Sequence, residues 1–274
     1  MSESQQLRDR ADQVLELHEA GEFDAALEAA ESLEAAAAAG DLTDEVVRES
    51  LFTARFERAL LLSDLGEVEQ AADAYARAAA TPTDPDDPDQ RHEVAMALLN
   101  RGICLDATGD PQAAISAYDE VVARFGDADD PVTADLAVRA RTNRAASLLG
   151  LGQATAAIDE VTTISAELAD DEPLAVEQLL IGRRLRAAAE HQLGRVEAAL
   201  AAVTGLPGQD LDDPAVVVQR AAAEHDRAEL LLELDRTDEA GDALDHLDGL
   251  VTAEPELADL GDEVARTRAR LTNG

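Results

Sequence analysis

The chain has 274 residues and a formal net charge of −37, and its 22 lysine-plus-arginine positions are all arginine. Aromatic residues make up 2% and hydrophobic residues 46%, so a core would consist mainly of Ala, Leu and Val. The acidic surface argues against nucleic acid as a partner, because it repels phosphate. No apolar stretch approaches the ~20 residues of a membrane span or the core of a signal peptide, so we expect a cytoplasmic protein with no membrane partner.

A unit of two amphipathic helices recurs around a turn residue. The turn residues are Gly21, Gly66, Gly109, Gly152, Gly194 and, in the same role, Asp235, so the spacing falls from 45 to 41 residues. The six repeats span about 5–40, 44–82, 88–125, 131–168, 173–207 and 214–250. Residues 255–271 follow as one unpaired helix that caps the end. We therefore predict an all-α fold of thirteen helices without strands, forming a single domain over residues 1–274.

Residues at fixed distances from each turn are alike. Small residues stand seven positions before it: Val14, Ala59, Gly102, Ala145, Ala187 and Ala228. Five positions after it every copy has alanine: Ala26, Ala71, Ala114, Ala157, Ala199 and Ala240. Four positions before it stands Leu, except for Glu190, and the positions nine and twelve after it are mainly apolar. Spacings of three and four on both sides of a turn predict two helices that face each other.

These columns resemble the tetratricopeptide repeat (TPR) family. The third copy is nearest, with Gly102, Leu105, Gly109, Ala114 and Tyr118 at the small, apolar, turn, alanine and aromatic places of the motif. The resemblance covers roughly residues 5 to 250 and implies a right-handed α-solenoid of antiparallel helix pairs. The chain departs from the family in having no Trp, a period longer than about 34 residues, and Arg at the place of the motif Leu in five copies.

Acidic residues stand where new helices start. Asp44 is a good N-cap, and an acid precedes a proline at Asp87-Pro88, Asp130-Pro131, Glu172-Pro173, Asp213-Pro214 and Glu254-Pro255. Proline suits the first helical position and the acid can accept backbone N–H bonds, so we interpret these pairs as helix starts. Two alternatives stay open for the acidic linkers, which are a divalent-cation site and an edge that captures a basic partner. A further explanation of the acidity is hydration at high salt.

Arginine recurs eight positions before the turn in five copies: Arg58, Arg101, Arg144, Arg186 and Arg227. We interpret this ladder as guanidinium groups that bridge to acids on the paired helix or in the neighbouring repeat, with an anion site as the alternative. Cys104 lies between Ile103 and Leu105 in a helix and reads as a small core residue.

The TPR resemblance implies that the first helix of each pair lines a concave groove that binds peptides. The stripe ten, six and three positions before each turn is apolar early in the chain and polar later. Its last two copies are Arg184, Ala188, His191, His225, Glu229 and Leu232. With two neighbouring residues, the predicted groove consists of Phe56, Leu60, Leu99, Ile103, Arg139, Asn143, Arg184, His191 and His225. A ligand would seat an apolar residue on the early part and an acidic group at Arg139 or Arg184.

No catalytic motif or phosphate loop occurs, so we expect a non-enzymatic scaffold or adaptor that binds a protein or peptide, without cofactor or metal. We expect it to be a monomer or a weak homo-oligomer. One alternative of another class is a ligand- or metal-sensing protein, because His225 and Glu229 are one turn apart and His191 belongs to the preceding repeat.

Overall fold

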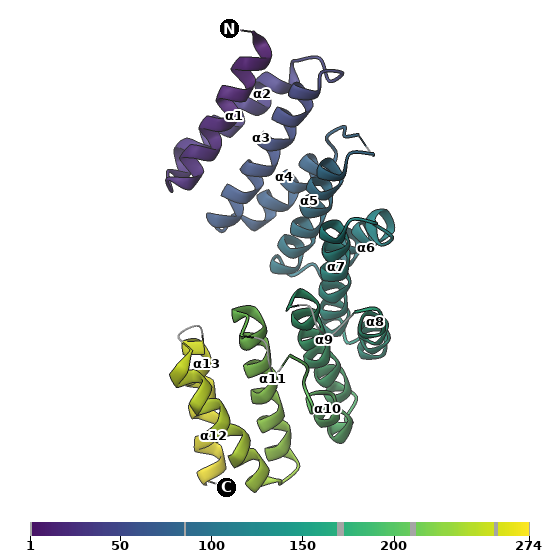
Figure 1. The fold of residues 1–274 in the computed structure, drawn as a ribbon, viewed down its shortest axis with the longest axis vertical. Coiled ribbons are helices and arrows are strands. Elements are labelled where there is room, and N and C mark those ends of the chain that lie inside the picture. The colour runs from purple at the N-terminus through teal and green to yellow at the C-terminus, as the bar shows by residue number, and fades with distance from the viewer. Residues whose placement is uncertain (1, 85, 169–172, 209–211, 255–256, 274) are drawn as a thin grey trace. The chain divides into compact units, whose positions relative to one another are not determined.

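The computed structural model describes residues 2–84, 86–168, 173–208, 212–254 and 257–273, and Figure 1 shows them as helices joined by short connections. The thirteen helices of these residues are α1 (Glu3–Glu19), α2 (Phe23–Ala38), α3 (Glu45–Asp64), α4 (Val68–Ala79), α5 (Pro88–Ala107), α6 (Pro111–Phe125), α7 (Pro131–Gly150), α8 (Ala154–Glu167), α9 (Pro173–Gln192), α10 (Val196–Ala202), α11 (Pro214–Glu233), α12 (Thr237–Ala253) and α13 (Ala258–Asn273). No strand occurs in the described ranges. The predicted all-α fold of helix pairs is confirmed.

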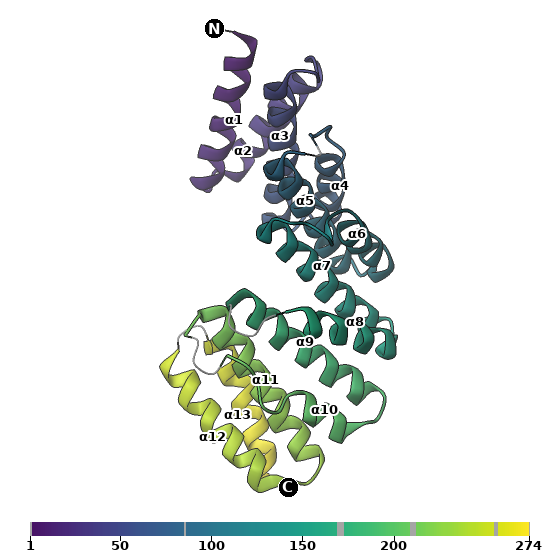
Figure 2. The ribbon, with the colours of Figure 1, turned by 45° about the vertical axis from the view of Figure 1, so that its right-hand side comes forward.

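The chain divides into two compact units, unit 1 over Met1–Asn143 and unit 2 over Arg144–Gly274. In unit 1 consecutive helices pack on each other from α1 to α6, and α1 also packs beside α3. In unit 2, α9 packs beside α11 and α11 beside α13, while α10 packs against α9 and α11, and α12 packs against α11 and α13. Each unit is thus a stack of TPR-like helical hairpins (Figure 2). That all 274 residues form one continuous right-handed solenoid stays a prediction.

The six predicted turn residues all adopt the left-handed backbone conformation. The glycines have φ between 72° and 79°, and Asp235, at 58°, is the one non-glycine residue with positive φ in the described chain. At Gly109 the N–H bonds the carbonyl of Asp106, and the next N–H, of Asp110, reaches back to the carbonyl of Leu105. Equivalent bonds occur at the other five turns. This is the Schellman arrangement, which satisfies the last carbonyls of the first helix and turns the chain into the second.

The residue columns that were recognised in the sequence form the core of both units. All six alanines five positions after the turn are buried, at 0 or 1% exposure. The column nine positions after the turn is also buried, from Ala30 in the first copy to Leu244 in the sixth. Glu190, the exception in the Leu column, is buried at 7% and forms an ion pair with Arg195 at 3.2 Å. Cys104 is buried as predicted.

The helix starts follow the predicted acidic caps. The side chain of Asp44 accepts from the N–H of Val46 at 2.9 Å, and Asp87, Asp130 and Asp213 likewise accept backbone N–H groups of their own first turns. Glu172 lies outside the described ranges, as does Pro255, whereas Glu254 is described as the C-cap of α12. The aspartate carboxylates bond backbone N–H groups of the helices that follow them, which supports their interpretation as N-caps.

In the fifth hairpin α10 ends at Ala202, before the predicted end of the repeat at residue 207. Gly205 and Gly208 have φ values of 63° and 73°, and Pro207 lies between them. The positive φ of the two glycines and the missing N–H of Pro207 prevent a helix from continuing there. Leu206, twelve positions after the turn, is nevertheless buried at 6% exposure. This apolar position therefore belongs to the core although it lies outside α10.

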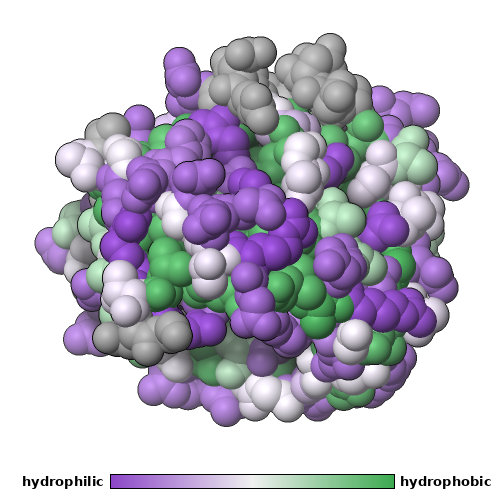
Figure 3. All heavy atoms as spheres, turned by 90° about the horizontal axis from the view of Figure 1, so that it is seen from below, coloured by the Kyte–Doolittle hydropathy of each residue, from purple (hydrophilic) through white to green (hydrophobic). Residues whose placement is uncertain are grey.

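The last helix, α13, packs against α11 and α12 and buries Leu257, just before it, and Val264. On the face drawn in Figure 3, hydrophilic residues predominate and hydrophobic residues form scattered patches between them. Within the described residues, none of the helices combines the length and the apolar character that a membrane crossing requires.

Candidate binding pocket

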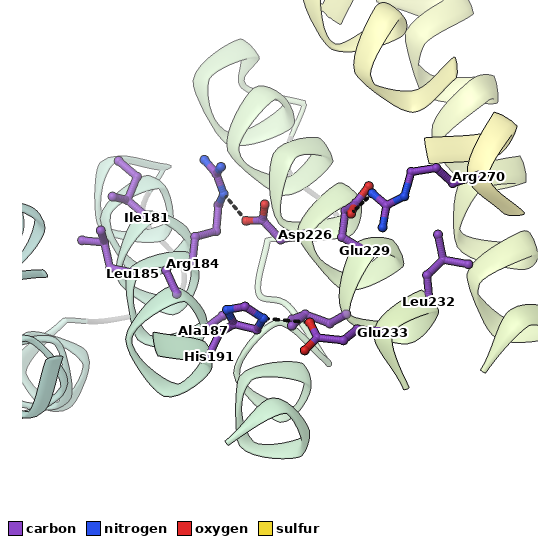
Figure 4. A pocket seen from close by; sticks show the side chains of 12 residues that line it. Ile181, Arg184, Leu185, Ala187, His191, Asp226, Glu229, Leu232, Glu233 and Arg270 are labelled. Atoms are coloured by element: carbon purple, nitrogen blue, oxygen red, sulfur yellow. Dashed lines mark hydrogen bonds and ion pairs between the residues drawn. The ribbon is translucent and has the colours of Figure 1, made fainter. Parts of the chain in front are cut away.

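A pocket of about 780 Å³ lies in unit 2 along the helix α11, with α9 on one side and α13 on the other (Figure 4). From α9 the lining residues are Ile181, Arg184, Leu185, Ala187, Ala188 and His191. From α11 they are Asp226, Glu229, Leu230, Leu232 and Glu233, and from α13 Arg270. The pocket therefore lies on the first helices of consecutive hairpins, which is where the TPR resemblance places the groove.

Helical spacing explains why these side chains share one face. Asp226, Glu229 and Glu233 are three and four residues apart on α11, so they lie one above the other on the same side of the helix. On α9, Arg184, Ala188 and His191 follow the same rule. The apolar part of the wall is built from the same helices, with Leu230 buried at 8% and Ala187 at 3%.

An ion pair and a histidine–carboxylate hydrogen bond tie α9 to α11 across the pocket rim. Nε of Arg184 donates to Oδ2 of Asp226 at 2.7 Å, and Nη1 of Arg184 donates to Oε1 of Gln219 at 3.2 Å. Nε2 of His191 lies 2.7 Å from Oε2 of Glu233. Each pair joins residues 42 positions apart, which is about one repeat. Both pairs are half-exposed, so their contribution to stability is small, at about 0–1 kcal/mol each.

Between α11 and α13 the rim is held by Glu229. Its carboxylate accepts a hydrogen bond from Thr267 at 2.5 Å and another from the guanidinium of Arg270. Partial burial raises the pKa of Glu229, but these two hydrogen bonds outweigh it and hold the pKa below its ordinary value. Glu229 is therefore a carboxylate at neutral pH, and α13 forms a wall of the site as well as the end of the stack.

The predicted groove residues of unit 2 divide into two groups. Arg184 and His191 line the pocket, together with Ala188, Glu229 and Leu232 of the same predicted stripe. His225 does not line it, because its side chain is only 14% exposed and its Nε2 bonds Oγ1 of Thr267 at 3.0 Å. His191 and His225 therefore have different partners. No group of three His, Cys, Asp or Glu residues that could hold a metal ion occurs among the described residues, so the convergence that the metal-sensing alternative requires is not found.

In unit 1 much of the predicted apolar groove belongs to the core. The ring of Phe56 stacks on Phe52 and meets Tyr75 edge-on, each at 5.5 Å between ring centroids. Leu99 is only 4% exposed, which corrects its assignment to a ligand-facing surface. Leu60 is half-buried against the same core, whereas Ile103 is 46% exposed. Leu99 and Ile103 are one turn apart on the same side of α5, but only Leu99 belongs to the buried cluster that also contains Leu136 and Ala140.

The two remaining groove residues of unit 1 lie on α7. Nε of Arg139 forms an ion pair with Asp135, one turn earlier on the same helix, at 3.4 Å. Asn143 forms a hydrogen bond with the hydroxyl of Tyr118, a member of the aromatic column. Both side chains therefore have partners within their own unit.

Two residues of the arginine ladder, Arg58 and Arg144, bridge helices as interpreted. Arg58 reaches Glu31 of the preceding hairpin at 3.4 Å, and Arg144 reaches Glu160 of its own second helix at 2.5 Å. Arg227 instead pairs with Glu224 on its own helix at 3.0 Å. The bridging interpretation therefore holds at two of the five positions, and Arg101 and Arg186 form no ion pair within the described residues.

Seven pocket residues were not part of the predicted groove stripe: Ile181, Leu185, Ala187, Asp226, Leu230, Glu233 and Arg270. Asp226 and Glu233 each follow a residue of the predicted stripe by one position, and this neighbouring column is the one that turns toward the preceding hairpin. A search for charge pairs one repeat apart would have found them. Arg270 was assigned only to the end of the capping helix.

Comparison with known proteins gives the following similarities. No protein-family model matches the chain, and no curated protein matches it. A solved structure of a putative kinesin light chain with nearly identical TPR-like repeats, from Podosopora anserina, is 15% identical with a TM-score of 0.45 and covers 93% of this chain and 99% of its own. The TPR2AB domain of yeast Sti1 in complex with pHSP90 is 16% identical with a TM-score of 0.39, covering 98% of this chain and 99% of its own. The TPR domain of P58(IPK) is 17% identical with a TM-score of 0.34, covering 98% and 66%.

Proposed function

We propose that the chain is a scaffold or adaptor that binds a segment of another protein in the pocket formed by α9, α11 and α13, without catalysing a reaction. The observation that carries the proposal is the composition of the pocket. An apolar wall that includes Leu185 and Leu230 is surrounded by a rim of charged groups that already hold one another in place. Protein interfaces have this composition, with an apolar centre for an anchoring side chain and a polar rim.

The dimensions of the pocket support the same function. Its volume of about 780 Å³ lies within the range of roughly 300–1,000 Å³ that is typical of ligand pockets. The rim is held by ion pairs between consecutive hairpins, so its shape exists before the ligand arrives. A preformed rim lowers the conformational entropy that is lost on binding.

Selection of peptides tests this proposal without knowledge of the natural partner. A displayed library of random dodecapeptides is selected on the full chain, and enriched peptides are synthesised for affinity measurements by fluorescence anisotropy. Ala188 lines the pocket and is exposed, so Ala188→Trp fills the site without disturbing the core. We expect this substitution to weaken binding by at least about tenfold, which is on the scale of losing a central contact.

A matched control is provided by the preceding repeat. Ala146 is also exposed and occupies the same position, six residues before its turn, on α7, but it does not line the pocket. Ala146→Trp should leave the affinity unchanged. If the enriched peptides bind the Ala188→Trp and the parent proteins equally well, the pocket is not the binding site and the proposed function fails.

A further inference from the structure

The three carboxylates of the pocket all come from one helix. Asp226, Glu229 and Glu233 form an acidic stripe along α11, whereas the cationic groups of the rim come from α9 and α13 (Figure 4). A ligand that lies along α11 therefore contacts the acidic stripe along its length and meets the arginines at the sides. The middle of the site is acidic and its flanks are basic.

Two oxygens of this stripe are available to a ligand. Asp226 bonds Arg184 through Oδ2, and Glu233 bonds His191 through Oε2. Within the described part of the chain, Oδ1 of Asp226 and Oε1 of Glu233 accept no hydrogen bond. Each carboxylate can thus keep its partner in the protein and also accept a cation from the ligand.

Unit 2 as a whole is negatively charged, like the acidic stripe on α11. Residues 144–274 contain 11 arginines and 27 aspartates and glutamates, a formal charge of −16. A cationic segment is attracted during its approach, and an anionic segment is repelled by the unit before it reaches Arg184. Arg184 already bonds Asp226 through Nε and Gln219 through Nη1, so its charge is partly neutralised and attracts an acidic ligand group less than an unpaired guanidinium would.

From this charge complementarity we infer that the pocket takes a segment of a partner protein in which Lys or Arg residues flank one or two apolar side chains. The inference rests on the proposed function and names its ligand class. Asp226 and Glu233 are seven residues apart on α11, which corresponds to about 10 Å along the helix axis. An extended segment spans about 10 Å in three residues. Because alternate side chains of an extended segment share a face, two cations four positions apart, about 13 Å, point to the same side. Their long side chains reach both carboxylates, and an apolar residue midway between them lies over the wall that contains Leu230.

The peptide selection described above measures this inference through the composition of the enriched sequences. We expect them to carry a net positive charge and an apolar residue between the cations. Replacing both cations of an enriched peptide by Glu should weaken its binding to the parent protein at least about tenfold, the scale expected for losing two charge-assisted bonds. This arm needs no change to the protein and so does not depend on how a variant folds.

Charge substitutions in the protein distinguish binding by the carboxylates of the pocket from attraction by the net negative charge of unit 2. The double variant Asp226→Asn/Glu233→Gln removes two charges from the stripe, and Asp238→Asn/Asp242→Asn removes two from exposed positions on α12, outside the pocket. The first should weaken the basic peptide by roughly tenfold, and the second by less than about twofold at an ionic strength near 0.15 M, where distant charges are screened. Circular dichroism and urea unfolding verify that both variants are folded.

Every outcome decides the inference. Basic peptides that depend on Asp226 and Glu233 support it, whereas equal losses in the two double variants would show a field effect only and overturn it. Enriched acidic peptides that Ala188→Trp blocks would overturn the basic ligand class and leave the proposed function standing. Peptides that are indifferent to Ala188→Trp would overturn both.

Discussion

The ring of Tyr118 occupies the space that a side chain on Gly102 would need, since a Cβ built on Gly102 would lie 2.3 Å from Cε1 of Tyr118. Tyr118 is 1% exposed, and its hydroxyl donates a hydrogen bond to Oδ2 of Asp106 at 2.9 Å. The ring is therefore fixed both by packing and by a polar contact. Gly102, the smallest of the six residues that stand seven positions before a turn, thus faces the ring of Tyr118 on the second helix. The two helices of the third hairpin approach closely there.

Gly102→Ala should lower the free energy of unfolding by about 1–3 kcal/mol, because the added methyl group overpacks a filled site. Urea unfolding measures the change. The control is Gly249→Ala, which lies inside α12 with no atom within 4 Å of its added Cβ, and which should raise stability by about 0.5–1 kcal/mol through helix propensity. In a Tyr118→Val background, which copies the Ala145 and Val161 pair of the next repeat, the cost of Gly102→Ala should largely disappear. A cost that persists there would rule out the ring as its cause.

Asp235 stands in the left-handed conformation that glycine occupies at the other five turns. Asp235→Gly should raise the free energy of unfolding by roughly 0.5–1 kcal/mol, because glycine adopts positive φ without a Cβ clash. The reciprocal change, Gly109→Asp, should lower it by a similar amount, and no atom lies within 4 Å of its added Cβ. Chemical denaturation of both variants checks the pair. Effects of the same sign would show that backbone strain does not govern these turns.

Arg144 and Arg101 occupy the same column but have different surroundings. Nη2 of Arg144 lies 2.5 Å from Oε2 of Glu160, whose side chain is 14% exposed, whereas no ion pair of Arg101 occurs among the described residues. Arg144→Met should cost about 1–3 kcal/mol, since it takes the guanidinium away from a largely buried carboxylate. Arg101→Met keeps its packing stem and should cost less than about 1 kcal/mol. Thermal unfolding of the two variants compares them directly, and equal losses would contradict the structural role assigned to the Arg144 pair.

Glu93 on α5 makes stability depend on pH. Burial, followed by repulsion from Glu49, Asp87 and Asp89, raises the pKa of Glu93 to about 7 from an ordinary value of 4.5. The folded state holds this proton more tightly than the unfolded state, so the contribution of Glu93 to stability falls as the pH rises from about 4.5 to about 7.

Glu93→Gln should therefore match the parent protein in stability at pH 4.5 and exceed it at pH 8. The difference at pH 8 is on the order of 1 kcal/mol, less than the full pKa shift implies because the side chain is half-buried and partly screened by solvent. Glu49→Gln, at an exposed position, is the control and should shift the curve only slightly. A constant difference between the Glu93→Gln and parent proteins across this pH range would disprove the assignment.

The net charge of −37 should make the stability sensitive to monovalent salt. Because like charges repel in the folded chain, the melting temperature should rise progressively between about 10 mM and about 1 M sodium chloride as the Debye length shrinks from ~30 to ~3 Å. Differential scanning calorimetry provides the measurement. A flat response would show that the folded state is not limited by repulsion, and stabilisation by millimolar calcium alone would favour the cation-edge alternative for the linkers.

The sequence by itself determined the hairpins. The turn at Gly109 and the column of Ala114 were correctly placed, because a left-handed turn and an apolar stripe are properties of a segment of about forty residues. The conformation of Asp235 was also determined at this level, by its position in the repeat.

Only the tertiary structure decided which side chains of the predicted groove are exposed. Leu99 and Ile103 are one helical turn apart, yet the first is 4% and the second 46% exposed, since burial depends on how far the next hairpin rotates over the helix. The pairing of Arg184 with Asp226 across 42 residues likewise depends on the distance and rotation between two packed helices. A repeat pattern shows which residue stands at each position of the repeat. Whether two residues of neighbouring repeats touch depends also on the distance and angle between the packed helices that carry them.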